Sequence, residues 1–88
     1  MIGINLHNGE RTLPSDLFVT VNDLNQAGQP VVLLNQRINV DQTFPTNVQE
    51  DGNGNGNISW TAQSVDGSHT NQGTQTAGAG TTVEVTSW

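Results

Sequence analysis

Hydrophobic and polar residues alternate along most of the chain, the pattern of β-strands with one buried face. The alternation is clearest in four segments: residues 2–6, 17–22, 58–63 and 82–86. Residues 31–34 read Val-Val-Leu-Leu without alternation, which predicts a strand covered on both faces. Alternation then resumes with Ile38 and Val40 predicted inward. The change predicts a bulge or bend near Asn35, or two strand pieces.

Short turn sequences separate these segments. Asn8-Gly9 and Asp66-Gly67 are hairpin signals, because both central positions of a type I′ turn need positive φ. A short return strand is expected after Asn8-Gly9, through residues 11–13, and residues 68–76 predict a solvated edge strand. No stretch has helical spacing over three turns. Six to eight short strands therefore predict an all-β fold, either a small antiparallel β-sandwich or a compact barrel.

Length and composition limit what can hold such a fold together. The 88 residues make a single domain, residues 1–88, and a chain this short buries only about 60–65% of its unfolded surface. Hydrophobic residues are 32% of the sequence, below the roughly 45–50% of ordinary domains. Cysteine is absent, so no disulfide can compensate. The thin core predicts a bound ion, a tightly closed sheet or a homo-oligomer.

Charge excludes one class of partner. The formal net charge is −6, and Arg11 and Arg37 are the only arginines in a chain without lysine. No cationic face can displace phosphate counterions, so nucleic acid is excluded and anionic membranes are disfavoured. No apolar run approaches the ~18 residues of a membrane span. With no targeting signal either, we expect a soluble protein without membrane insertion, extracellular or cytosolic.

The glycine–asparagine segment after residue 50 has the oxygen spacing of a calcium loop. The candidate ligands stand at alternate positions: Asp51, Asn53, Asn55, the carbonyl of Asn57, and Ser59. A glycine follows the third ligand, as in an EF-hand-type loop, but Ala62 stands where a bidentate acid belongs. Ca²⁺ is therefore a candidate cofactor. The alternative is a polar loop whose glycines and asparagines adopt left-handed conformations.

The two tryptophans are predicted to differ in position. Trp60 shares a strand face with Ile58, which predicts a place in the core. Trp88 shares a face with Glu84 and Thr86, so its ring is predicted to point outward. An outward ring has three possible roles: stacking on a sugar, anchoring a subunit contact, or folding back over the edge of the core.

The sequence offers little for catalysis. It has no cysteine nucleophile and no serine in a nucleophile-elbow pattern. His7 and His69 fall on solvent-facing or loop positions. A triad of histidine, Ser64 or Ser68, and Asp66 has nothing in the sequence to order it. We therefore expect that the protein is not an enzyme.

Two segments resemble the small calcium-dependent, fucose-binding bacterial lectins. Thr12-Leu13-Pro14 with the following strand at residues 17–21 is similar to the opening strand of that family, and Glu50-Asp51-Gly52 is similar to its acidic calcium loop. The resemblance covers about a third of the chain and implies a sugar-binding β-sandwich. This chain is shorter, has asparagine where the family has several aspartates, and does not place the loop near its C-terminus. These departures put the two-calcium sugar site of the family in doubt.

Two functions are consistent with these features. The first is a lectin-like domain that binds a carbohydrate or glycoconjugate, with or without calcium. Its candidate ligand-binding residues are Trp88, His69, Asn71 and Asp66. The alternative is a structural or interaction module, such as an adhesin, coat or assembly domain, which self-associates through sheet edges without a small ligand.

Overall fold

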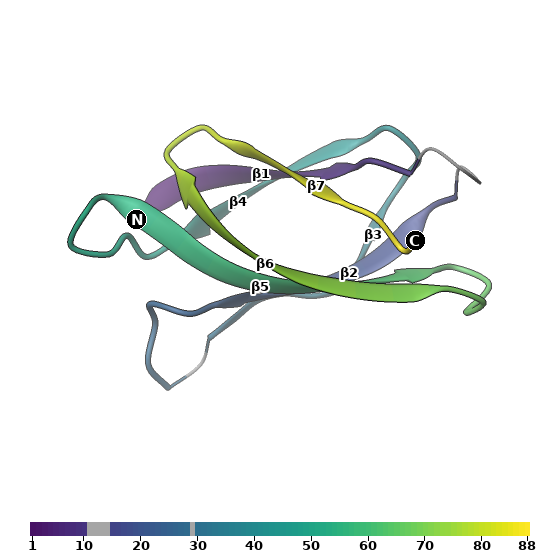
Figure 1. Cartoon of the computed structure of the whole chain (residues 1–88), viewed down its shortest axis with the longest axis horizontal. Coiled ribbons are helices and arrows are strands. Elements are labelled where there is room, and N and C mark those ends of the chain that lie inside the picture. The colour runs from purple at the N-terminus through teal and green to yellow at the C-terminus, as the bar shows by residue number, and fades with distance from the viewer. Residues whose placement is uncertain (11–14, 29) are drawn as a thin grey trace.

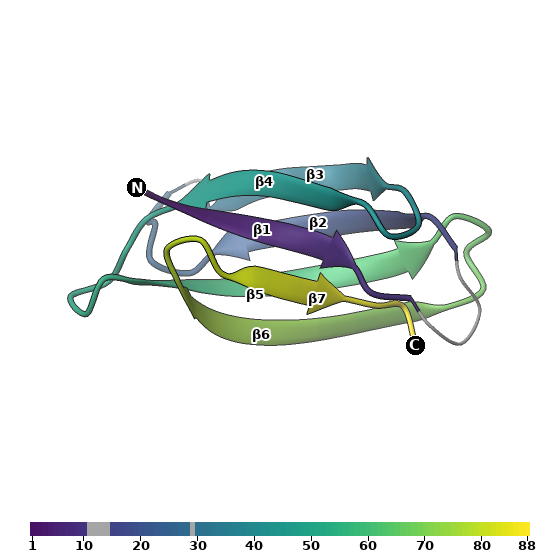
Figure 2. The same ribbon diagram turned by 90° about the horizontal axis from the view of Figure 1, so that it is seen from above.

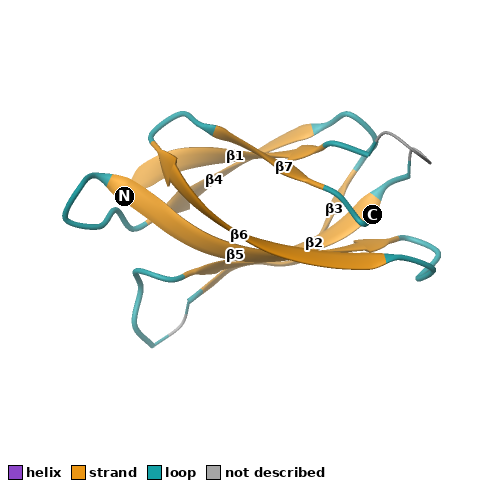
Figure 3. Cartoon of the chain, viewed as in Figure 1, coloured by secondary structure: helices purple, strands orange, loops and turns teal. Residues whose placement is uncertain are grey.

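Seven strands form two stacked sheets in the computed structural model, which describes residues 1–10, 15–28 and 30–88 (Figure 3). The strands are β1 (Ile2–Asn8), β2 (Leu17–Asp23), β3 (Val31–Ile38), β4 (Thr43–Val48), β5 (Asn55–Ser64), β6 (Thr70–Gly78) and β7 (Thr82–Val85). One sheet has the order β4-β1-β7 and the other β3-β2-β5-β6 (Figure 1). Within the described ranges, no helix is long and apolar enough to cross a membrane. The predicted all-β fold is confirmed as a sandwich.

The alternating positions of both sheets face each other and form the core. In β2, Leu17, Val19 and Val21 are fully buried, whereas Phe18 and Thr20 lie on the outer face. The predicted inward positions of β5 are confirmed as well. Among the described residues, the apolar core contains Ile4, Leu6, Leu17, Val19, Val21, Ile38, Val48, Ile58, Trp60, Ala62, Ala77, Val83 and Val85.

The predicted hairpin at Asn8-Gly9 is wrong. β1 is the central strand of its sheet, with β4 antiparallel on one side and β7 parallel on the other, which leaves no free edge for a return strand. The Asn8 side chain is buried and donates to the carbonyls of Ser15 (2.8 Å) and Ile38 (3.1 Å). The Gly9 N–H donates to the Val85 carbonyl at 2.9 Å. The return strand itself falls at residues outside the described ranges.

The apolar segment at residues 31–34 is more exposed than the sequence predicted. β3 is an edge strand, and Val31 and Leu34 are 49% and 73% exposed, so the segment is not covered on both faces. The predicted bulge is confirmed, because the β2–β3 register shifts near Asn35, which has a φ of 48°. Val40, predicted inward, lies beyond the end of β3 and is 45% exposed.

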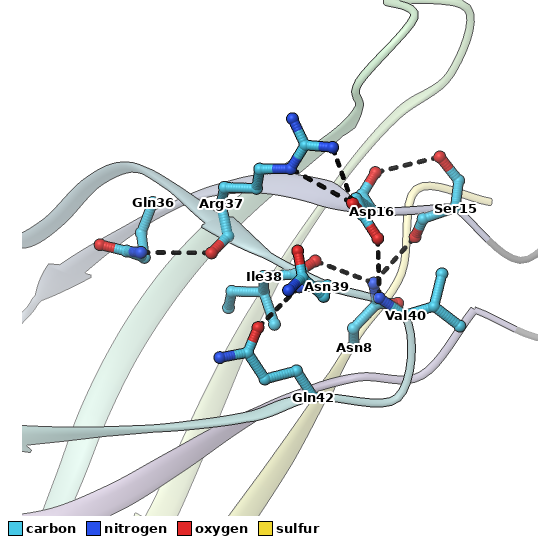
Figure 4. A network of polar contacts seen from close by, with 9 residues as sticks. All are labelled: Asn8, Ser15, Asp16, Gln36, Arg37, Ile38, Asn39, Val40 and Gln42. Carbon is cyan, nitrogen blue, oxygen red and sulfur yellow. Dashed lines mark hydrogen bonds and ion pairs between the residues drawn. The ribbon is translucent and has the colours of Figure 1, made fainter.

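A polar network ties the strand ends together at one end of the sandwich (Figure 4). The Arg37 guanidinium donates to one Asp16 oxygen through Nε (3.2 Å) and Nη2 (2.8 Å), and the Val40 N–H donates to the other at 2.9 Å. These donors, the arginine first, lower the pKa of the Asp16 carboxyl. The ion pair cancels the charge of Arg37 on the outer face of β3.

The second hairpin signal and the polar edge strand are both confirmed. β5 and β6 form an antiparallel pair along their whole length, joined through a turn in which Gly67 has a φ of 77°. The Gly67 N–H donates to the Ser64 carbonyl at 2.8 Å. β6 is the edge of its sheet and lies on the side opposite β3 (Figure 2).

Near the start of β5, one residue packs directly against β1 and β4 of the facing sheet. Gly56 is buried there, and a Cβ at this position would lie 2.5 Å from Val48 Cγ2 and 2.7 Å from Ile4 Cδ1. Both neighbours are fully buried, so an added methyl group would have to displace core side chains. Glycine lets the two sheets pack here without that displacement.

We therefore expect Gly56→Ala to lower the free energy of unfolding by about 1–3 kcal/mol, the usual cost of overpacking a core. Equilibrium urea unfolding measures this change. The matched control is Gly52→Ala in the preceding loop, where nothing lies within 4 Å of the added Cβ. Equal stabilities for the two variants would contradict this account of the sheet contact.

Candidate functional site

The proposed calcium loop joins β4 to β5, and hydrogen bonds to Asp51 fold it. One Asp51 carboxylate oxygen accepts the backbone N–H groups of Asn53 (2.8 Å) and Asn55 (3.0 Å). The other accepts the side-chain amide of Asn57 at 2.9 Å. These donors, the Asn55 N–H first, lower the pKa of Asp51. The carboxylate is therefore compensated by N–H groups of its own loop.

The other candidate ligands do not turn toward Asp51 as a set. The main-chain carbonyl of Asn57 accepts the N–H of Leu24 at 2.8 Å, and the Asn57 side-chain oxygen accepts the Thr76 hydroxyl at 2.7 Å. Ser59 lies further along β5, where its hydroxyl is 3.5 Å from the Asn22 amide. Among the described residues, no three acids or histidines gather as a metal site. A calcium ion at Asp51 would therefore have to displace the hydrogen bonds that this carboxylate accepts from Asn53, Asn55 and Asn57.

A buried aspartate missed in the sequence anchors the same loop. Asp23 is fully buried at the end of β2. Its carboxylate accepts the backbone N–H groups of Gln49 (2.7 Å) and Asn25 (3.1 Å). The Asn25 amide then donates to the Gln49 carbonyl at 2.9 Å. Two loops are thereby tied together, which gives this carboxylate a structural role.

Three of the four predicted sugar-binding residues lie together at one corner. The rings of His69 and Trp88 stack with centroids 3.5 Å apart and an interplanar angle of 36°. The Asn71 amide and the Thr86 hydroxyl each donate to the Trp88 carbonyl at 3.2 Å. Trp88 is 48% exposed, as predicted. The chain here folds back from β7 onto β6, which matches the third of the roles considered for this ring.

The fourth residue, Asp66, serves the β5–β6 turn. One of its oxygens accepts the hydroxyl (2.7 Å) and N–H (2.9 Å) of Ser68 and the hydroxyl of Ser64 (2.7 Å). These donors, the Ser68 hydroxyl first, lower the pKa of Asp66 to about 2. The side chain is therefore engaged within its own turn, and the ring of His69 stacks on Trp88 instead of joining it.

The outer face of the four-stranded sheet carries grooves that the sequence analysis did not single out. Between β2, β5 and β6, a groove of about 520 Å³ is lined by Asn22, Ser59, Trp60, Thr61, Gln72, Gly73 and Thr74. A second hollow of about 370 Å³ adjoins it at Thr74 and includes the exposed side chain of Leu24. Phe18 lines a third on the same face. The alternating sequences of β5 and β6 could have indicated this polar face, because nearly every second residue of each strand is polar and points outward.

Among the described residues, this face carries no acid of its own strands, although the chain is strongly acidic. Six of the eight acids lie between strands, Asp23 is buried, and Glu84 belongs to the other sheet. The charge of Arg37, on β3 beside Phe18, is cancelled by Asp16. The grooves are therefore lined by hydroxyls, amides and apolar groups, with no charged side chain among the lining residues.

His7 forms a polar clamp on the other sheet that the sequence did not reveal. Its Nδ1 lies 2.7 Å from a Glu84 carboxylate oxygen, and its Nε2 lies 2.9 Å from Asp41. The hydrogen bond to Glu84 is the main cause that raises the pKa of His7. The ring thus links β1 to β7 and to the turn between β3 and β4.

No protein family, no curated protein and no solved structure matches this chain. Its function is therefore argued from the groups that the fold brings together.

Because the Asp51 loop is closed by its own amides, we expect thermal melts in excess calcium and in chelator to coincide. A ligand that binds only the folded state raises stability by RT ln(1 + [L]/Kd), so a filled site would be visible. Asp51→Asn is the control. A rise in Tm with calcium that this variant loses would contradict the hydrogen-bond account and support the calcium prediction.

The His7 clamp should make stability depend on pH. A raised pKa means that the clamp contributes fully below the unfolded value of 6.5 and is lost as pH rises through the folded value. The difference in unfolding free energy between wild type and His7→Gln should therefore shrink from pH 5.5 to 8.5. Glu84→Gln should remove most of this dependence. A difference that stays constant with pH would show that the ring acts only by packing.

Proposed function

We propose that this protein is a carbohydrate-binding domain that holds a neutral glycan along the outer face of β2, β5 and β6. The observation that carries the proposal is the uncharged groove lined by hydroxyls and amides on a chain of net charge −6. Its volume of about 520 Å³ is within the usual range of ligand sites, about 300–1,000 Å³. Calcium has no part in this proposal.

The groups of the groove match the chemistry of a sugar. Thr61, Gln72 and Thr74 are exposed and hydrogen-bond to no other described side chain, so their polar atoms are available to a ligand. Hydroxyl and amide groups both donate and accept, as sugar hydroxyls do. Phe18 and Leu24, beside the neighbouring hollows, offer apolar surface to the C–H faces of sugar rings.

The uncharged character of the face also limits the ligand. Among the described residues, a phosphorylated or sulfated glycan would find no unpaired cation on this face, because Arg37 is paired with Asp16. A hydrophobic ligand would leave the amides and hydroxyls without partners, which costs free energy for each group. A neutral, hydroxyl-rich chain is the class that satisfies both conditions.

The corner at Trp88 is the weaker candidate for the same function. One side of the indole is occupied by the His69 ring, and the nearby Asn71 amide already donates to the Trp88 carbonyl. These contacts hold the chain end against β6. The groove, in contrast, has polar groups without protein partners.

Screening neutral glycans, from monosaccharides to extended oligosaccharides, followed by calorimetric titration of the hits, tests the proposal. We expect the double variant Ser59→Ala/Thr61→Val to weaken binding by about tenfold or more, because two lost hydrogen bonds of ~0.5–1.5 kcal/mol each together reach about 1–3 kcal/mol, and a tenfold change is 1.4 kcal/mol. Thr82→Val, an exposed threonine of the other sheet, is the control and should bind as wild type.

Trp88→Phe distinguishes the groove from the corner. Binding that survives this change and is weakened by the groove variant supports the groove. Binding lost with Trp88→Phe alone would move the site to the corner. Absence of binding to every neutral glycan would overturn the proposed function.

A further inference from the structure

Three of the four sheet edges carry features that oppose pairing with another strand. β4 contains Pro45 opposite Asn5, β3 has its bulge at Asn35, and β7 is only four residues long. Prolines, bulges and short edge strands are the usual means by which proteins prevent edge-to-edge association.

The fourth edge, β6, has none of these features. It runs regularly for nine residues, Thr70–Gly78, and contains no proline and no charged residue. Its pairing with β5 has a constant register from one end to the other. A long, regular and uncharged edge strand is a template for another strand.

The register identifies the backbone groups on that free edge. The Ser64 N–H donates to the His69 carbonyl, so this pair and every second pair after it are hydrogen-bonded. The remaining residues of β6 turn their N–H and C=O groups away from β5. These residues are Thr70, Gln72, Thr74, Thr76 and Gly78, of which Gly78 already accepts the Thr81 N–H through its carbonyl.

We propose that two copies of this chain associate through β6, antiparallel and related by a two-fold axis near Gly73. In this register Thr70 pairs with Thr76 and Gln72 with Thr74 of the other copy. The outward N–H and C=O groups of these four residues are then all hydrogen-bonded. A second copy fits this edge because its own β6 is equally uncharged and presents the same groups. The two four-stranded sheets then form one eight-stranded sheet.

This dimer would place the outer-face grooves of both copies side by side. Gln72 and Thr74 line a groove and also belong to the proposed junction. The dimer does not depend on sugar binding, because backbone groups form it. Oligomeric state and glycan binding can therefore fail independently.

Sedimentation over a wide concentration range tests the dimer, with Thr74→Pro as the blocking variant. The Thr74 N–H points away from β5, so its loss removes no hydrogen bond within the chain. Thr43→Pro is the matched control, because the Thr43 N–H faces the free edge of β4 by the same alternation. We expect wild type and Thr43→Pro to dimerise and Thr74→Pro to be monomeric.

A second pair of variants keeps the test independent of proline strain. Gln72→Lys places like charges across the junction, whereas Gln63→Lys adds the same charge on the same face but on β5. Only the first should dissociate the dimer. Amide hydrogens of Gln72, Thr74 and Thr76 should also exchange more slowly as protein concentration rises.

Wild type that stays monomeric up to about 1 mM, where association is worth only about 4 kcal/mol, would overturn the proposal. So would a dimer that persists unchanged in Thr74→Pro and Gln72→Lys. Dissociation by Thr43→Pro or Gln63→Lys alone would assign the contact to another surface.

Discussion

The sandwich depends on one narrow apolar layer in which small residues set the distance between the sheets. In the part of the chain that the structure describes, thirteen buried apolar side chains fill it, most of them at every second position of a strand. At Gly56 the layer leaves no room for a single methyl group beside Ile4 and Val48. Polar side chains close the ends of this layer, with Asn8 and Asp23 among the buried ones. A thin core of this kind tolerates little change in register, because slipping by one residue would turn polar residues inward.

The sequence predicted those parts of the fold that depend on local pattern. Alternation placed Ile58 and Trp60 inward, and Asp66-Gly67 marked a real turn, because a two-residue period and a positive φ are local properties. Asn8-Gly9 failed because its environment is set by distant segments. β7 and β4 occupy both sides of β1, and no local pattern reveals a parallel pairing across 77 residues, such as Asn8 with Val85.

For the candidate sites as well, the sequence shows local spacing but not contacts between distant segments. The alternate oxygens from Asp51 to Ser59 predict a calcium loop, but spacing does not show which atoms already have partners. Amide side chains both donate and accept, so Asn57 can satisfy Asp51 without an ion. The corner of His69 and Trp88 was found from exposed aromatic chemistry. The groove was missed because its residues, among them Thr61 and Thr74, are ordinary polar strand residues until two strands align them.

The distribution of charge connects the groove with the β6 edge. Eight acids against two arginines give the molecule a field that opposes the close approach of another copy. That opposition is weakest where no acid lies, along the outer face of β5 and β6 and the edge that continues it. Association and glycan binding are thus directed to adjoining surfaces by the same property. Separating the two experimentally requires changes to backbone N–H groups at the edge and to side chains within the groove.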